Sequence, residues 1–80
     1  MLHNPVLITG QLRSRADLYR ALAANTYGSH RPAPTNLDGM ADLLREYHVE
    51  KVLCAGWGLT EEDTSAVLTV FADLGITLHR

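Results

Sequence analysis

Two short apolar runs that lie far apart in the chain set the main constraint on the fold. Residues 6–9 and residues 51–55 are rich in β-branched and aliphatic side chains, and a glycine follows each run, so both are predicted to be buried strands. Residues 10–50 between them carry helical patterns. Helical connections between apolar strands indicate a parallel sheet.

Helix start signals divide the rest of the chain. Ser14 predicts a helix over residues 15–24, with Asp17 at its third position. Residues 25–35 contain two prolines and form a long loop, and loops of this length are often functional. Thr35 or Asn36 caps a second helix. Its apolar positions show helical spacing and are Leu37, Met40, Ala41, Leu44 and Tyr47.

The C-terminal part predicts one more helix and one more strand. Thr60 with Asp63 has capping-box spacing, and Gly75 is a natural helix stop. Residues 76–78 form a last short strand. The predicted fold class is therefore α/β: a two-layer domain in which a three-stranded parallel sheet packs against helices, with residues 1–80 forming a single domain.

Size and composition exclude several protein classes. A chain of 80 residues and 8.8 kDa buries a modest core, which argues against a large enzyme cavity. No apolar run approaches the ~20 residues of a membrane helix. Residues 1–5 show neither a basic flank nor a signal-peptide stretch, and the one cysteine has no internal disulfide partner. A cytoplasmic protein without membrane association is expected.

Charge is unevenly distributed along the chain. Residues 1–35 carry four arginines and one aspartate, whereas residues 36–80 carry eight acids and three cations. No basic stripe suited to a phosphate backbone is present, so direct nucleic-acid binding is not expected. An acidic C-terminal part favours a basic partner.

Motifs for catalysis or cofactor binding are weak. The four histidines do not lie at metal-ligand spacing from one another or from Cys54, so no metal or cofactor is predicted. Cys54 lies in an apolar strand and is interpreted as a small buried hydrophobe. Gly56-Trp57-Gly58 lies where a dinucleotide fingerprint would lie, but Glu61 replaces its third glycine. The segment is interpreted as a strand-end turn, and a small enzyme or nucleotide-binding domain stays as a minor alternative.

The second helix carries the most informative pattern. At about 100° per residue, Asp38, Asp42 and Glu46 occupy one stripe opposite the apolar side. A solvated surface explains such a stripe in many helices, but like charges four residues apart repel each other by about 0.2–0.5 kcal/mol per pair. Asp73 opposes the dipole near the end of the third helix. Carboxylates at unfavourable positions suggest a basic surface that pairs with them.

Three blocks of residues, in order, resemble the barstar family. The first is Ile8-Thr9-Gly10 with Ser14-Arg15-Ala16-Asp17-Leu18. The second and most specific is Asn36-Leu37-Asp38, followed by Asp42 and Leu44. The third is Leu59-Thr60-Glu61 with Val67-Leu68-Thr69-Val70-Phe71. Barstar proteins are intracellular inhibitors of the bacterial ribonuclease barnase and related guanyl-specific ribonucleases.

The resemblance implies a function and a set of contact residues. It implies that the chain is not an enzyme and forms a one-to-one complex with a small secreted ribonuclease, whose basic active-site cleft the acidic helix occludes. By position, Asp42 would occupy the substrate-phosphate pocket, Asp38 would pair with further cations, and Asp73 would make a peripheral ionic contact. The residues assigned to the partner interface are Asn36, Leu37, Asp38, Ala41, Asp42, Arg45, Tyr47 and Asp73.

The chain departs from the family pattern around the predicted interface. Pro32-Ala33-Pro34-Thr35 stands where the family has a Tyr-Gly pair, and Tyr27-Gly28 lies several residues earlier. Either the loop is remodelled around an insertion, or Tyr27 has another role. Arg45 places a cation close to the acidic residues. The alternative hypothesis is therefore a barstar-like module that binds a different basic protein and does not inhibit ribonucleases.

Overall fold

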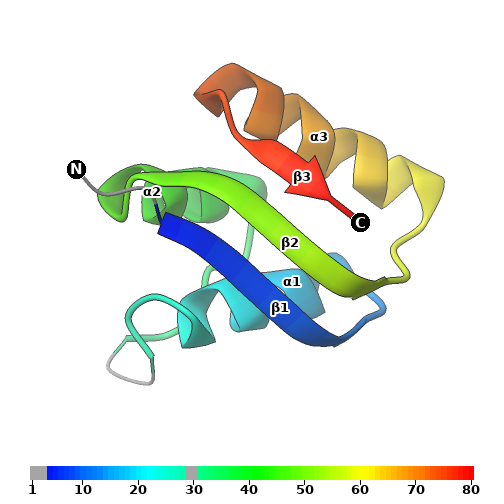
Figure 1. The fold of residues 1–80 in the computed structure, drawn as a ribbon, viewed down its shortest axis with the longest axis horizontal. Helices are drawn as coiled ribbons and strands as arrows, with labels where there is room; N and C mark the ends of the chain where they lie inside the picture. Colours follow the sequence, from blue (N-terminus) through cyan, green and yellow to red (C-terminus); the bar gives the residue numbers. More distant parts are fainter. Residues whose placement is uncertain (1–3, 29–30) are drawn as a thin grey trace.

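The computed structural model describes residues 4–28 and 31–80, and its six elements follow the predicted order (Figure 1). The elements are β1 (Asn4–Leu12), α1 (Arg15–Ala24), α2 (Leu37–Glu46), β2 (Val49–Trp57), α3 (Glu61–Leu74) and β3 (Thr77–His79). Both strand pairs are parallel, in the order β1-β2-β3. The predicted fold class, a small α/β domain with a three-stranded parallel sheet, is confirmed.

Local capping signals fix where the helices begin and end. Ser14 Oγ accepts the N–H of Asp17 at 3.2 Å, and Thr60 Oγ1 accepts the N–H of Asp63 at 3.1 Å. At the C-terminus of α3, Gly75 has the left-handed conformation with φ 72°, which glycine adopts without steric cost. The predicted bounds of α1 and the predicted ends of α3 are therefore confirmed.

The strands are longer than their apolar runs. Both β1 and β2 have nine residues, and pairing extends from Val49 opposite Asn4 to Trp57 opposite Leu12. Irregularities in register occur between Asn4 and Pro5 and between Ile8 and Gln11. The last strand lies one residue later than predicted, because Ile76 is 8% exposed and packs in the core ahead of the pairing.

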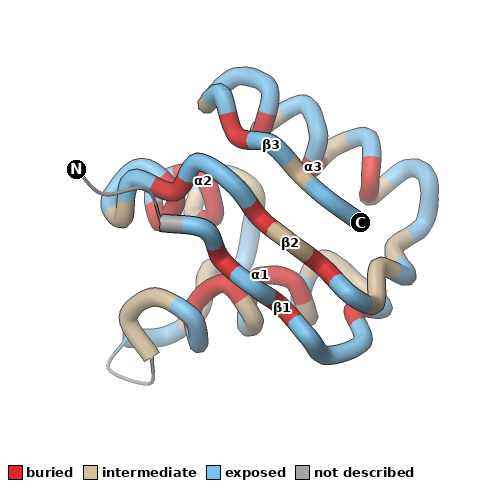
Figure 2. Tube along the Cα trace, in the orientation of Figure 1, coloured by how far each residue is buried: buried red, intermediate tan, exposed pale blue. Residues whose placement is uncertain are grey.

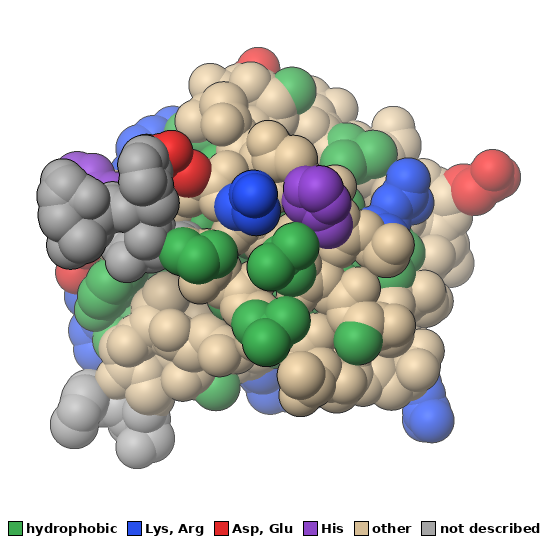
Figure 3. Space-filling model, in the orientation of Figure 1, with side chains coloured by type: hydrophobic (Ala, Val, Ile, Leu, Met, Phe, Trp, Pro, Cys, Tyr) green, Lys and Arg blue, Asp and Glu red, His purple; other side chains and the backbone are tan. Residues whose placement is uncertain are grey.

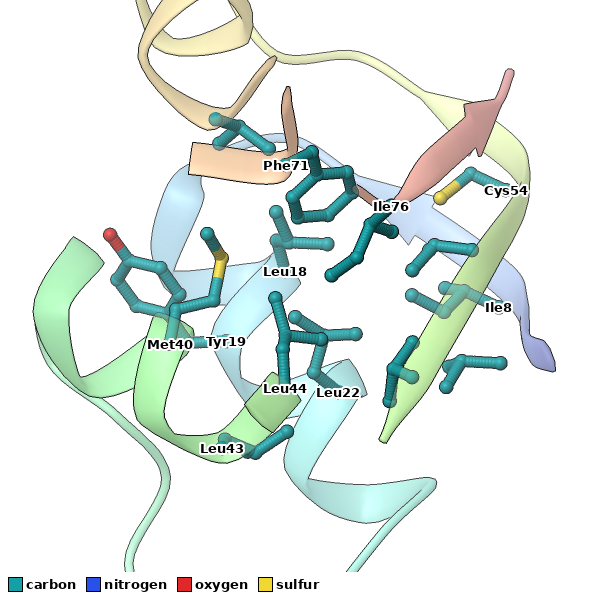
Figure 4. Close-up of a cluster of buried hydrophobic side chains, with 14 of the residues drawn as sticks. Ile8, Leu18, Tyr19, Leu22, Met40, Leu43, Leu44, Cys54, Phe71 and Ile76 are labelled. Atoms are coloured by element: carbon teal, nitrogen blue, oxygen red, sulfur yellow. The ribbon is translucent and has the colours of Figure 1, made fainter. Parts of the chain in front are cut away.

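The core lies between one face of the sheet and the helices. Figure 2 shows buried positions alternating with exposed ones along β1 and β2, which is the pattern of a strand with one covered face. In Figure 4, Ile8 and Cys54 from the strands lie in the same cluster as Leu22, Leu44 and Phe71 from the helices. The fully buried members include Leu18, Leu22, Met40, Val52 and Val67. This packing holds α2 firmly on the domain.

Candidate interaction site on helix α2

Helix α2 begins at a well-defined cap. Asn36 Oδ1 accepts the N–H of Gly39 at 2.7 Å, so Asn36 rather than Thr35 is the N-cap. A Cβ atom on Gly39 would lie 3.2 Å from the Cβ of Pro34, which shows how closely the preceding loop approaches the helix. The first turn of α2 and the proline-containing loop therefore form one continuous surface.

The acidic side of α2 faces solvent. Asp38 is exposed and forms no ion pair with any residue in the described ranges. The Asp42 side chain is 79% exposed, and its Oδ1 accepts a hydrogen bond from Arg45 Nη1 at 3.1 Å. An exposed pair three residues apart contributes little to stability, about 0.2–0.5 kcal/mol. Both carboxylates are accessible to a partner, and Asp42 is partly neutralised.

Glu46, the third acid of the stripe, has a different role. Its Oε1 accepts a hydrogen bond from Arg31 Nη2 at 3.0 Å, and the Arg31 guanidinium lies 4.1 Å from the ring centroid of Tyr27. The rings of Tyr27 and Tyr47 are 6.1 Å apart, and the Tyr27 hydroxyl donates to the Pro32 carbonyl at 2.8 Å. The hydrogen bond to Glu46 raises the pKa of Arg31 above its already high usual value. We call these contacts the loop clasp.

The loop clasp gives Tyr27 a structural role, which the sequence alone did not determine. Tyr27 packs on Tyr47 at the C-terminal end of α2, and its hydroxyl donates to the carbonyl of Pro32 in the loop that precedes α2. The side chain of Tyr27 therefore holds the loop against α2, and the loop is anchored at both ends of the helix. Glu46 is engaged by Arg31 and Asp42 by Arg45, so Asp38 is the acid of the stripe that has no ion pair with any residue in the described ranges, while the Asp42 side chain stays 79% exposed.

An open groove of about 780 Å³ lies beside the N-terminus of α2. Its lining combines α1 residues, including Arg15, Tyr19 and Arg20, with loop and helix residues, including Pro34 and Asp38. Both arginines are paired: Arg15 Nε lies 3.1 Å from Asp63 Oδ1, and Arg20 hydrogen-bonds Asp17. The surface around Asp38 therefore mixes positive and negative charge, which the sequence pattern of α2 alone did not indicate.

Most of the predicted contact residues lie together on α2, and Ala41 is the most deeply buried of them. Ala41 is 9% exposed and belongs to the buried side of α2, so its methyl group offers little surface to a partner. Its assignment as a contact residue stays a prediction. Tyr47 is half-buried and packs on Tyr27, and Leu37 is half-buried beside the groove.

Asp73 lies on a different element. It is an exposed residue near the end of α3. The C-terminal ends of α2 and α3 share a hollow of about 300 Å³, lined by residues that include Arg45, His48 and Leu74. Asp73 therefore stands at the end of α3 that lies nearest α2, in keeping with a peripheral position relative to Asp42.

The turn after β2 is shaped by close packing. A Cβ on Gly56 would lie 2.9 Å from Gln11 Oε1, and a Cβ on Gly58 would lie 2.8 Å from the Leu12 carbonyl oxygen. Trp57 is half-buried and donates its indole N–H to Thr64 Oγ1 at 2.9 Å, a bond that the sequence did not predict. The glycines are thus needed where β2 passes the end of β1, which accounts for them without a nucleotide.

The remaining chemical features concern residues 4–28 and 31–80. No cluster of His, Cys, Asp and Glu in these ranges has the arrangement of a metal site. Cys54 is buried, and desolvation raises the pKa of its thiol. None of the helices in these ranges is both long and apolar enough to cross a membrane.

Comparisons of the chain with models of protein families, with curated proteins and with solved structures each gave no match. The resemblance to the barstar family therefore stays a prediction from the residues quoted above.

Proposed function

We propose that this chain is a non-enzymatic inhibitor of a small secreted bacterial ribonuclease. It binds one-to-one and blocks the basic active-site cleft with α2 and the loop before it. The observation that carries the proposal is the accessibility of Asp38 and Asp42, one helical turn apart on a helix whose other side is packed in the core. A cleft built to hold RNA phosphates is basic, so rigidly placed carboxylates can replace those phosphates.

The rigidity of the surface supports the same proposal. The Asn36 cap fixes the start of α2, and the loop clasp fixes residues 31–32 against its other end. A surface that is ordered before binding loses less conformational entropy when the complex forms. We expect the loop and α2 to bind as one preformed unit in a cytoplasmic complex.

The test is inhibition of purified guanyl-specific microbial ribonucleases by the chain and its variants. Asp42→Ala is expected to weaken inhibition by about tenfold or more, because it removes a charge that is buried against the partner. Asp38→Ala is expected to act in the same direction. Glu61→Ala is the matched control, because Glu61 is an exposed acid on α3, and it should change inhibition by less than about twofold. Equal losses in all three variants would contradict the proposal.

The association rate of an Arg45→Ala variant is a second, independent test of the proposal. The Arg45 guanidinium holds Asp42 and stands close to the surface that meets the basic partner. Arg45→Ala is expected to speed association with the ribonuclease, because it removes a repulsive charge and releases Asp42. Rising salt should reduce this gain through screening. Slower association of Arg45→Ala would show that Arg45 is itself a contact of the partner.

A second candidate function follows from the neutralised acids. Arg45 and Arg31 compensate Asp42 and Glu46, so the surface carries less negative charge than the stripe itself indicates. This favours a partner that is less strongly basic than a nuclease cleft. Under this alternative the chain is a barstar-like interaction module that binds another basic protein. Stoichiometric binding to a basic partner without any loss of RNA cleavage would identify it.

A further inference from the structure

The hydroxyl group of Tyr19 has no partner in the part of the chain that the structure describes. Tyr19 is 4% exposed, and its ring belongs to the core cluster (Figure 4). No hydrogen bond joins its hydroxyl to any residue in the ranges 4–28 and 31–80. Desolvation raises the pKa of Tyr19, so the hydroxyl stays protonated at neutral pH and can both donate and accept. Buried polar groups are nearly always hydrogen-bonded in proteins, so this exception points to a group from outside the chain.

The Tyr19 hydroxyl opens into the groove beside the N-terminus of α2. In the described ranges, no fully buried side-chain oxygen or nitrogen lacks a hydrogen bond, so this hydroxyl keeps some contact with solvent. Tyr19 lines the open groove of about 780 Å³, together with Leu37 and Asp38. In Figure 4 its hydroxyl points away from the centre of the cluster. The hydroxyl is therefore a polar group at the floor of this groove.

The groove has one charge that nothing in the described chain neutralises. Its two arginines are both paired, Arg15 with Asp63 and Arg20 with Asp17. Asp38 lines the same groove and forms no ion pair with any residue in the described ranges. These two cations and three acids give the groove and its immediate surroundings a net charge of −1. The unpaired charge therefore favours a cationic ligand.

An anionic ligand fits the groove less well. The N-terminus of α2 lies there, and helix N-termini favour negative charge. However, an incoming anion would meet the carboxylate of Asp38, and each arginine of the lining is already held by an acid. The repulsion from Asp38 acts against the helix dipole, so an anion is the alternative that the test below must separate.

The walls of the groove are apolar and belong to the helix layer. All of its lining residues come from α1, from α2 and from the loop between them, and the apolar ones include Ala16, Pro34 and Leu37. The groove is separate from the sheet face, whose centre carries hydrophobic side chains in Figure 3. Arginine and lysine side chains bury their aliphatic stems along such walls while the charged end reaches polar groups.

Two acceptors on different elements favour arginine over lysine. The carboxylate of Asp38 belongs to α2, and the hydroxyl of Tyr19 belongs to α1. A guanidinium carries five donors in one fixed plane, so it can bond to two acceptors at once. An ammonium is a compact point charge and lacks this planar set of donors.

We propose that the groove between α1 and α2 receives an arginine side chain of the partner protein. Its guanidinium pairs with the carboxylate of Asp38 and donates a hydrogen bond to the hydroxyl of Tyr19. Tyr19 is thus a further contact residue, and the interface extends from α2 onto α1, where the sequence predicted no contact. The inference rests on the proposed function, because that function supplies a partner with a basic surface beside Asp38.

The first test needs no ribonuclease and uses N-acetylarginine amide as the probe. Titrated into the isotope-labelled chain, the probe is expected to bind in the millimolar range and to shift the amide signals of Tyr19 and of residues 35–38. N-acetylcitrulline amide has the same shape without the charge, and it should bind about fivefold more weakly or less. N-acetyllysine amide should also bind more weakly than the arginine probe.

Variants of the chain identify the two acceptors. Asp38→Asn should weaken binding of the arginine probe about fivefold, and Tyr19→Phe about threefold. Glu61→Gln is the matched control, because Glu61 is an exposed acid on α3 outside the groove, and it should change binding by less than about twofold. Tyr19→Phe should leave Tm unchanged, because its hydroxyl has no bond within the described chain.

The second test measures inhibition of a ribonuclease. Tyr19→Phe should weaken inhibition about threefold or more, at an unchanged Tm. If the chain inhibits no ribonuclease but the arginine probe binds through Asp38 and Tyr19, the proposed function fails and the assignment of the groove stands. If inhibition depends on Asp42 but not on Tyr19, and the arginine probe does not bind, the assignment of the groove fails alone.

Three other results would overturn the proposal. Tighter binding of N-acetylglutamate amide than of the arginine probe would assign the groove to an anion. Equal binding of the arginine and lysine probes would contradict the choice of arginine. A lower Tm of Tyr19→Phe would show that the hydroxyl is bonded within the chain and is not held ready for a partner.

Discussion

The close approach of β2 to the end of β1 allows a sharp test of the packing. A Cβ on Gly58 would lie 2.8 Å from the Leu12 carbonyl oxygen, whereas a Cβ on Gly10 would have no atom within 4 Å. Neither glycine has a positive φ angle, so the backbone itself permits alanine at both positions. Gly58→Ala and Gly10→Ala therefore differ in steric contact alone.

The close contact at position 58 sets the expected loss of stability in Gly58→Ala. Ordinary contact begins near 3.4 Å, so the alanine methyl at position 58 forces a displacement of several tenths of an ångström. The Gly58 N–H donates to the same carbonyl at 2.7 Å, and that bond is strained by the shift. Overpacking lowers the free energy of unfolding by about 1–3 kcal/mol. The lower conformational entropy of an unfolded chain with alanine raises it by about 0.4–1 kcal/mol. We expect Gly58→Ala to lower the free energy of unfolding by about 1–2 kcal/mol.

The assay is urea or thermal unfolding followed by far-ultraviolet circular dichroism. In a domain of this size, 1 kcal/mol corresponds to about 4–8 °C in Tm. Gly10→Ala should unfold at the same temperature as the parent chain or a few degrees higher. A Gly58→Ala variant as stable as Gly10→Ala would refute the steric reason for the glycine, and would reopen the interpretation of Gly56-Trp57-Gly58 as a ligand-binding turn.

Three further outcomes are expected for the isolated chain. Thr64→Val should lower the free energy of unfolding by about 1–2 kcal/mol in urea denaturation, because the Trp57 indole N–H loses its acceptor. Arg31→Ala should speed backbone amide exchange in residues 31–36, because it removes both the contact with Tyr27 and the ion pair, while exchange in the sheet stays unchanged. The Arg13 backbone N–H bound to its carboxylate lowers the pKa of Asp17. The resulting stabilisation is present above about pH 4 and is lost as the pH falls through the folded-state pKa, so the gap in Tm between the parent chain and Asp17→Asn should narrow below pH 4.

Each of these outcomes has a control. Thr69→Val removes a hydroxyl that donates to the Ser65 carbonyl on the exposed side of α3, and its effect on unfolding should be small. Arg31→Lys keeps the charge but loses the planar group, and should give intermediate exchange. If the difference in Tm between the Asp17→Asn variant and the parent chain stays constant across acidic pH, the lowered pKa of Asp17 is contradicted.

Elements that depend on local chemistry could be predicted from the sequence. Ser14, Asn36, Thr60 and Gly75 determine helix ends through bonds within a few residues, and the structure has the helix ends at these caps. Strand ends were predicted less well, because the outer residues of β1 and β2 are held by each other rather than by their own apolar pattern.

The candidate site was predictable only in part. Helical spacing places Asp38 and Asp42 on the exposed side of α2, and the same spacing places Ala41 on the buried side. The loop clasp joins Arg31 to Glu46, which are 15 residues apart, through a loop with no periodic signal. The arginines of the groove lie on α1 and reach Asp38 only through the packing of the helices.

The pairing of β1 with β2 has a consequence for synthesis of the chain. Val6 lies opposite Val52, so this part of the sheet cannot close until Val52, 46 residues after Val6, has emerged from the ribosome. Contacts between residues so distant in sequence form slowly, because a long loop must first be closed. During that interval β1 has no neighbouring strand and, having no charged side chain, no electrostatic protection against pairing with another nascent chain. Protein yield should therefore depend on how quickly β2 follows β1 out of the exit tunnel.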